Sequence, residues 1–248
     1  QARYQQESKL RFALFFTLFV GGMVGTLLAA NMVLFLVFWE VMTLASYVLV
    51  AYETRERECV RAAYKYFFMT HLGSAALLLA IVLLRHAGGS WSFDAIPAAL
   101  AALAREQPVR LHVVLALLFL GFATKAGLYP FGDWLPDAHP AAPAPVSAVL
   151  SGAMVKIGLY GFLRFFVGAL AAASPEAAVD WGWVLGGFGL LSALVGGFAA
   201  AAAGDAKVLV AYSSIAQSGL IALGFGASLV LLPSSPSLAA LALLGACF

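Results

Sequence analysis

Charge and cysteine are both scarce in this sequence, and each shortage excludes a class of protein. Charged residues make up only 10% of the 248 positions and hydrophobic residues 63%, so a water-soluble domain of this composition would expose apolar surface and precipitate. The net charge of +2, without an extended basic run, argues against nucleic-acid binding. Cys59 and Cys247 lie far apart, which excludes a disulfide framework and the CxxC pairs that hold zinc or iron–sulfur clusters.

Sequence motifs for catalysis are missing as well. No glycine-rich nucleotide loop, no nucleophile paired with a base and no metal-ligand spacing occurs. We therefore expect no cofactor, no bound metal and no catalytic centre in the chain itself. Any electron transfer coupled to it has to take place in another protein.

Long apolar stretches dominate the sequence instead, separated by short polar breaks. Each is long enough to cross a hydrocarbon core of ~30 Å at a helical rise of ~1.5 Å per residue. The pattern predicts an all-α, polytopic transmembrane bundle that forms one domain over residues 1–248, with a short surface helix at 93–105. The expected spans are 10–29, 32–52, 62–84, 111–127, 146–170, 183–203 and 206–232. The chain starts at Gln1 and stops at Phe248 inside an apolar run, so we expect a fragment of a longer protein with its eighth span cut.

The fourth span is expected to be broken. It reaches Gly127 and Pro130 before it can finish cleanly, and further prolines follow at Pro136, Pro140, Pro143 and Pro145. Proline removes a backbone donor and clashes with the preceding turn, so the helix should be interrupted within or near the membrane.

The distribution of basic residues predicts the orientation. The larger group comprises Arg3, Lys9, Arg11, Arg55, Arg57, Arg61, Lys65 and Lys207, and the smaller group comprises Arg85, Arg105 and Arg110. Because cytoplasmic loops carry the excess of Lys and Arg, the side with the larger group should be cytoplasmic.

Three charged side chains, Glu40, Lys125 and Lys156, lie near the middle of apolar spans. Each costs ~2.5 to 3.5 kcal/mol at a helix centre, and charges in such positions are usually functional. An amine in a partly dry cavity holds its proton less tightly, and a carboxylate that approaches it reverses the effect. The three residues are therefore predicted to form a proton relay. The structural alternative is a static ion pair between Glu40 and Lys125 that joins two helices, with no obvious static partner for Lys156.

The surroundings of the two lysines support a polar interior. Small residues surround Lys125 in GFATKAGLYP, which indicates room for water or a neighbouring helix. Lys156 belongs to a row at four-residue spacing with Gly152, Tyr160 and Arg164, which indicates one polar stripe on its helix.

Further candidates have more ordinary explanations beside the functional one. His71 suits a proton relay but also a satisfied structural histidine. Asp133, Asp137 and His139 could form a proton mouth at the broken helix or a solvated loop. Lys207 could be part of the relay or sit at the interface, and Tyr160 is a candidate because it follows Lys156 by one turn. On the last span, Ser214, Gln217 and Ser218 could hold a line of waters or bond between helices.

Three segments resemble a known family. They are FWEVMTLASYVLV, DAKVLVAYSSIAQSG and, above all, KAGLYPFGDWLPDAHPAAPAPVSAVLSGAMVKIGLYGFLR at residues 125–164. The sequence is similar to the proton-translocating antiporter-like membrane subunits of respiratory complex I, Mrp antiporters and membrane-bound hydrogenases. THLGSA, with Ser74 where some complex I subunits carry an acid, resembles the hydrogenase-4 component B and formate hydrogenlyase subunit 3 branch.

The resemblance implies an inverted-repeat architecture, with the first repeat at 10–171 and the start of the second at 181–248. It implies that Glu40 is the key glutamate, Lys125 the lysine on the broken helix and Lys156 the relay lysine on the next helix. The implied partners are other membrane subunits and peripheral redox subunits, in the cytoplasmic membrane of a prokaryote. The implied function is proton translocation driven by a redox complex of the hydrogenase or NADH:quinone oxidoreductase type. The alternatives are a non-conducting membrane scaffold and a subunit of an Mrp-type Na⁺/H⁺ antiporter.

Overall fold

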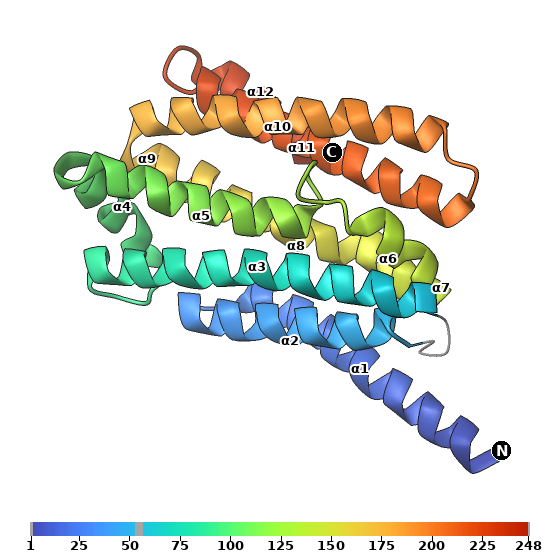
Figure 1. Cartoon of the computed structure of the whole chain (residues 1–248). Helices are drawn as coiled ribbons and strands as arrows, with labels where there is room; N and C mark the ends of the chain where they lie inside the picture. Colours follow the sequence, from blue (N-terminus) through green and yellow to red (C-terminus); the bar gives the residue numbers. More distant parts are fainter. Residues whose placement is uncertain (1, 53–56, 248) are drawn as a thin grey trace.

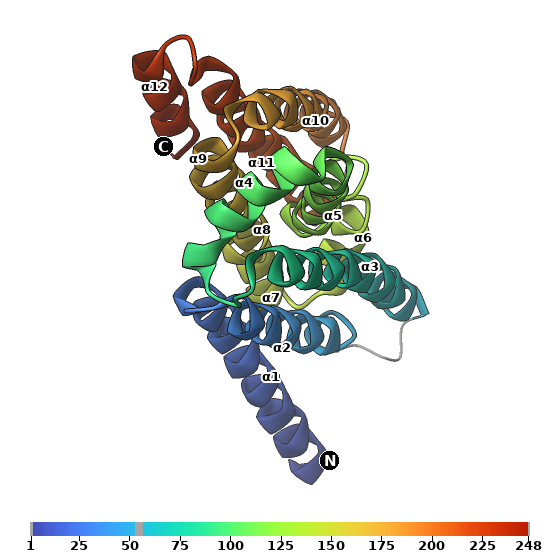
Figure 2. The same ribbon diagram turned by 90° about the vertical axis from the view of Figure 1, so that its left-hand side faces the viewer.

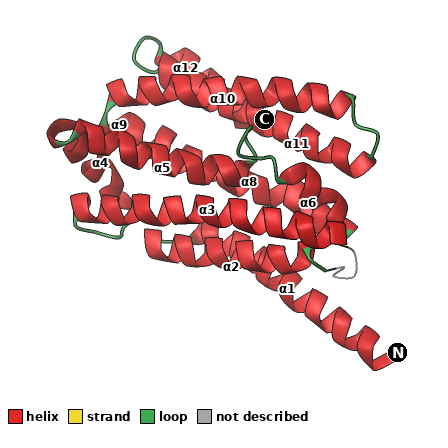
Figure 3. Cartoon of the chain, in the orientation of Figure 1, coloured by secondary structure: helices red, strands yellow, loops and turns green. Residues whose placement is uncertain are grey.

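The computed structural model describes residues 2–52 and 57–247, with side chains from Lys9 onward. Within these residues all regular elements are helices (Figure 3). A single isolated bridge between Asn31 and Ser92 links two helix-connecting segments. The predicted all-α class is confirmed.

In the described part of the chain, seven helices are long and apolar enough to cross a membrane, which confirms the predicted number of spans. Six are single elements: α1 (Ala2–Leu28), α2 (Met32–Val50), α3 (Arg57–Gly88), α5 (Pro108–Ala126), α10 (Pro175–Ala201) and α11 (Ala206–Leu231). The seventh is a continuous helix made of α7 (Ala144–Val149), the π-helical η2 (Leu150–Met154), α8 (Val155–Phe162), the π-helical η3 (Leu163–Leu170) and α9 (Ala171–Ala173). The shorter elements are η1 (Phe93–Ala95), α4 (Ile96–Glu106), α6 (Leu135–Ala141) and α12 (Pro236–Cys247).

Several helices are longer than their apolar cores, so their predicted ends were wrong. The α10 helix begins at Pro175 rather than near Trp183. Ser174 caps it, because its side chain accepts a hydrogen bond from the backbone N–H of Ala177, and proline suits the first helical position. Polar residues such as Glu176 therefore belong to the helix even though they do not belong to an apolar stretch.

The helices lie side by side in a bundle (Figures 1 and 2). The α1 helix packs on α2, α3 packs on α5, and α10 packs on α11. In Figure 1 the pair α10 and α11 lies above α5 and α8, with α3 and α2 below them. The N-terminal part of α1 projects away from the other helices in both views.

The predicted interruption after Lys125 is present. The α5 helix ends at Ala126 and is followed by Gly127, whose φ of 73° is in the left-handed region that glycine adopts without strain. Trp134 holds the non-helical segment against the helix end, because its indole N–H donates to the carbonyl of Thr124 at 2.9 Å. The chain resumes as α6, and Pro140 lies inside that short helix.

Members of the two predicted groups of basic residues lie at opposite ends of the bundle. Lys65 and Lys207 contact residues of the α6 region at one end, whereas Arg85 stacks over Trp91 near α4 at the other. Figure 1 shows α4 and α6 at opposite ends of the bundle. Arg55 and the side chain of Arg3, which belong to the larger basic group, lie outside the described residues.

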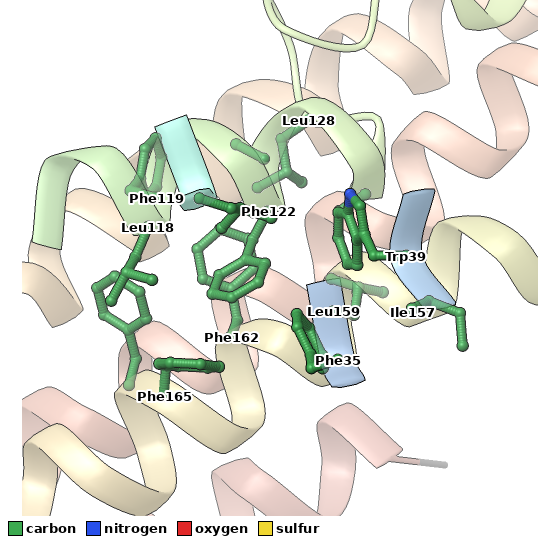
Figure 4. Close-up of a cluster of buried hydrophobic side chains, with 14 of the residues drawn as sticks. Phe35, Trp39, Leu118, Phe119, Phe122, Leu128, Ile157, Leu159, Phe162 and Phe165 are labelled. Carbon is green, nitrogen blue, oxygen red and sulfur yellow. The ribbon is translucent and has the colours of Figure 1, made fainter. Parts of the chain in front are cut away.

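An aromatic core fills the space between α2, α5 and the helix that contains α8 (Figure 4). Phe122 of α5 lies within ring contact of Trp39, Phe162 and Phe165. These rings are fully or almost fully buried. Because Trp39 directly precedes Glu40, this packing also fixes the part of α2 that holds the acidic residue.

Candidate functional site

Lys125 is buried near the end of α5, with an exposed fraction of 1%. Its Nζ donates a hydrogen bond to the Thr43 hydroxyl of α2 at 2.7 Å. The amine also lies 5.5 Å from the ring centre of Trp39 and 5.9 Å from that of Tyr66. Aromatic faces attract cations, so one hydroxyl and two rings surround an amine that has lost its water.

Hydroxyl groups continue from this lysine toward the end of the bundle that holds α6. The Thr43 hydroxyl donates to the carbonyl of Trp39, and Ser46 donates to the carbonyl of Thr43. The hydroxyls of Ser46 and Tyr66 are 2.6 Å apart, and all three of these side chains are buried. They form a polar layer between α2 and α3.

Glu40 and Lys125 do not form a direct ion pair in the described residues. The Glu40 carboxylate is within electrostatic range of the lysine, but the side chain it contacts is His71 of α3, with Nε2 3.5 Å from Oε2, a contact that is an ion pair when the imidazole is protonated. The other ring nitrogen of His71 bonds with the carbonyl of Phe67 at 2.9 Å. The static Glu40 to Lys125 pair considered from the sequence is therefore not what the structure contains, and His71 takes that place.

Lys156 lies on the neighbouring helix at a similar level. Gly158, two residues after it, is in backbone contact with Ala126, the residue after Lys125. The Lys156 amine donates to the carbonyl of Ser151 at 3.1 Å, within the π-helical segment η2. Its partner among the described residues is thus a backbone carbonyl and not a carboxylate.

The predicted polar stripe on this helix is divided in two. Tyr160 and Arg164 bond with each other, and the Arg164 guanidinium lies 3.4 Å from the ring centre of Phe93. Tyr160 also donates to the carbonyl of Leu27 at 3.4 Å. These contacts leave Lys156 as the residue of the stripe that bonds to Ser151 of η2.

The three residues at the broken helix are not one group. Asp133 and Asp137 both pair with Lys65, with O to Nζ distances of 2.7 Å, and these side chains are partly exposed. His139 is fully buried on another face of α6, where its Nδ1 bonds with the Ser147 hydroxyl at 2.9 Å. Lys207 donates to the backbone carbonyls of Pro140 and Ala142.

His139 is neutral at physiological pH. It lies in α6, outside the seven membrane-length helices. Burial lowers its pKa from the ordinary value of 6.5 to about 4, with the nearby charge of Lys207 as the smaller cause.

Sequence reasoning missed several polar residues of the interior. Ser46, Tyr66, Ser147 and Ser151 all contact a candidate residue or continue its hydrogen bonds. The available signal for Ser46 was its position three residues after Thr43, on nearly the same face of α2. Tyr66 carries no such signal, because only the packing of α3 on α2 brings it to the site.

Possible metal-ligating side chains do not gather in one place in the described residues. Across residues 2–52 and 57–247, no group of three or more His, Cys, Asp or Glu side chains is placed to ligate one.

Known proteins share much of this sequence. Residues 29–232 match the family model described as NADH:quinone oxidoreductase/Mrp antiporter, TM. The chain is 36% identical over 246 residues to hydrogenase-4 component B of Escherichia coli K12, a match that covers 99% of this chain and 35% of that protein. It is 34% identical to one subunit of the Na⁺/H⁺ antiporter of Alkalihalophilus pseudofirmus, over 98% of this chain and 30% of that protein.

A solved structure is similar as well. One chain in the structure of the membrane-bound sulfane sulfur reductase, an archaeal respiratory membrane complex, superposes with a TM-score of 0.75 at 30% identity. The match covers 94% of this chain and 39% of that one. The present chain thus spans only about a third of the length of the relatives it matches.

Proposed function

Because the chain belongs to the NADH:quinone oxidoreductase/Mrp antiporter transmembrane family, we propose that it is part of a proton-translocating membrane subunit of a multisubunit redox complex. The carrying observation is the buried Lys125 amine, held by a hydroxyl and two rings with an acidic residue on the adjacent helix. A charged group in such a place is expensive unless it has a task.

The proposed step is a change of partner by Glu40. Bound to His71, the carboxylate leaves Lys125 with Thr43 alone. If Glu40 moves toward Lys125, the charged amine is stabilised, and if it returns to His71 the proton is released.

Lys156 is the proposed next carrier. Its helix touches that of Lys125 at Gly158, and α11 lies beyond it. We assign residues 10–171 to a first inverted repeat and 181–248 to the start of a second. The remaining part of the path would lie in the portion of the family's length that this chain does not span.

The energy has to come from elsewhere, because moving one charge against 100 mV requires about 2.3 kcal/mol. We propose that other membrane subunits and peripheral redox subunits supply it, as in a hydrogenase or a complex I-like assembly. The protein itself is proposed to transfer no electrons. Its proposed location is the cytoplasmic membrane of a prokaryote, with the α6 end of the bundle toward the cytoplasm.

The test measures protons translocated per electron in inside-out vesicles that contain the full-length protein in its complex. Lys125→Ala should abolish translocation while electron transfer in the peripheral subunits continues. Tyr129 lies beyond the helix end and bonds to Ser192 only through its backbone N–H, so Tyr129→Phe serves as a control that should change nothing. Full-rate pumping by Lys125→Ala would contradict the assignment.

Transport and assembly measurements on the same protein also distinguish two alternative functions from proton translocation. Similarity to a protein of an Na⁺/H⁺ antiporter favours sodium as a second candidate cargo, and dependence of transport on Na⁺ in proteoliposomes would select it. A non-conducting scaffold would behave differently, because neutral replacements of Glu40 and Lys156 would lower assembly and leave protons per electron unchanged.

A further inference from the structure

We propose that Ser192 of α10 positions the Lys125 amine, because it holds the backbone of the segment that follows the end of α5. This break segment comprises residues 127–134 and ends where α6 begins. The inference rests on the proposed proton translocation and adds a positioning residue to it. Ser192 is not proposed to carry a proton.

The break segment has a backbone N–H that depends on another helix. Inside a bilayer, the backbone groups that an interrupted helix leaves free have to be satisfied by protein or ordered water, and serine and threonine side chains commonly do this. The N–H of Tyr129 donates to the Ser192 hydroxyl at 2.9 Å. The amides of Leu128 and Gly132 bond instead to carbonyls within their own stretch of chain. Tyr129 is therefore the point at which α10 holds the break segment by its backbone.

The Ser192 hydroxyl is fixed in the role of acceptor. Its side chain is 0% exposed, and its oxygen donates to the carbonyl of Phe188 at 2.6 Å. A hydroxyl has one hydrogen and two lone pairs. Because the hydrogen is used within α10, a lone pair is available to the N–H of Tyr129, and the serine joins its own helix to the break segment.

Aromatic packing holds the break segment at a second point. The ring centre of Phe188, one turn before Ser192, lies 5.7 Å from that of Phe131 in the break segment. The same ring lies 5.1 Å from Phe119 of α5. One side chain of α10 thus contacts both the helix before the interruption and the segment after it, so α10 fixes how these two parts meet.

The neighbouring helix α11 supports Ser192 from behind. A Cβ added to Gly219 of α11 would overlap the Cβ of Ser192, and one added to Gly189 of α10 would overlap the backbone nitrogen of Leu223. Small residues at such positions let helix backbones approach closely. Ser192 therefore has no room to withdraw from Tyr129 toward α11, and a movement of the α10 and α11 pair is passed to the break segment.

The break segment in turn contacts the surroundings of the lysine. Trp134 is fully buried at its end and donates to the carbonyl of Thr124, the residue before Lys125. The ring centre of Trp134 lies 4.7 Å from that of Tyr66, which in turn lies 5.9 Å from the Lys125 amine. A displaced break segment would therefore move the backbone next to the lysine and one of the rings beside its amine. Both changes alter how tightly the amine holds its proton.

The first measurement is hydrogen–deuterium exchange in the full-length protein within its complex. In Ser192→Ala the Tyr129 amide loses its acceptor, so it should exchange several times faster than in the unaltered protein. Thr26→Ala is the matched control. Thr26 is also 0% exposed, and its hydroxyl donates to the carbonyl of Gly22 in its own helix. This variant should leave the exchange of Tyr129 unchanged.

The second measurement is the pH profile of protons translocated per electron in inside-out vesicles. Ser192→Ala should shift the pH of half-maximal translocation by about one unit, the scale on which changed neighbours perturb an ionisable group. Thr26→Ala should keep the original profile. A serine that only packs would lower the amount of assembled complex and leave the profile of the assembled fraction unchanged.

The outcomes separate this inference from the proposed function. Faster exchange of Tyr129 with an unchanged pH profile would overturn the positioning role of Ser192, and so would unchanged exchange. If either result accompanies lost translocation in Lys125→Ala, the inference fails alone and the proposed function stands. Full translocation in Lys125→Ala would overturn the proposed function itself.

Discussion

Replacing Lys125 by methionine should make the protein more stable and inactive at the same time. Methionine has a similar length and no charge. The buried amine gains one hydrogen bond to Thr43 and two ring contacts, worth about 1.5 to 3 kcal/mol for the bond and up to about 2 for the rings. Removing an ammonium group from water costs several kcal/mol even after relaxation.

In the described residues no carboxylate lies within ion-pair distance of this amine, so the loss of hydration outweighs its contacts. We expect Lys125→Met to raise the free energy of unfolding by about 1 to 4 kcal/mol, the range of stabilisation found when buried ion pairs are replaced by apolar residues. Lys125→Ala leaves a cavity instead and should be about 2 to 5 kcal/mol less stable than the methionine variant. Both should lose proton translocation.

The measurement is thermal or denaturant unfolding of the full-length protein in detergent, beside the vesicle assay. Lys65→Met is the matched control, because the Lys65 amine is partly exposed and pairs with Asp133 and Asp137. Partly exposed pairs contribute little, so this variant should change stability by less than about 1 kcal/mol. If Lys125→Met destabilises the protein as much as Lys125→Ala, the amine serves to hold the helices together, and the argument that its burial costs stability is refuted.

Two further predictions follow from packing and from burial. Gly158→Ala should destabilise the protein by about 1 to 3 kcal/mol and slow translocation, since the new Cβ would overlap the backbone nitrogen of Ala126. The control is Gly187→Ala, whose new Cβ meets nothing within 4 Å. Equal unfolding curves for the two variants would refute the close contact. The pKa of His139, lowered to about 4 in the folded protein, means that stability is full above pH ~6.5 and falls by at most about 3 kcal/mol as the pH drops toward 4. His139→Gln should flatten that part of the stability profile, and an unchanged profile would show that another group causes the acid loss.

The choice of candidate residues could be made from the sequence because the membrane makes charge informative. Glu40, Lys125 and Lys156 stand out in apolar spans, where every ionisable group costs free energy. The interruption after Lys125 was predictable for a related reason, since Gly127 and Pro130 leave few ways to continue a helix. The charges within apolar spans and the helix interruption both depend on local composition, which can be read directly from the amino-acid sequence.

The partners of those residues could not be predicted in the same way. The pairing of Glu40 with His71 depends on how α2 and α3 are rotated against each other, and the bond from Lys156 to Ser151 depends on a π-helical turn. Hydrophobic periodicity tolerates rotations that move a side-chain end by several ångströms, whereas a hydrogen bond tolerates only tenths.

Amino-acid order alone therefore determined that the chain is a helical membrane protein, how many times it can cross and which charges lie within it, because hydropathy and backbone chemistry act over a few residues. Tertiary structure alone decided which neighbour each charge has, and it placed Glu40 beside His71 and His139 beside Ser147. Those contacts join residues from different helices or opposite sides of a helix break, and only the packing of the aromatic and glycine surfaces between the helices sets their distances.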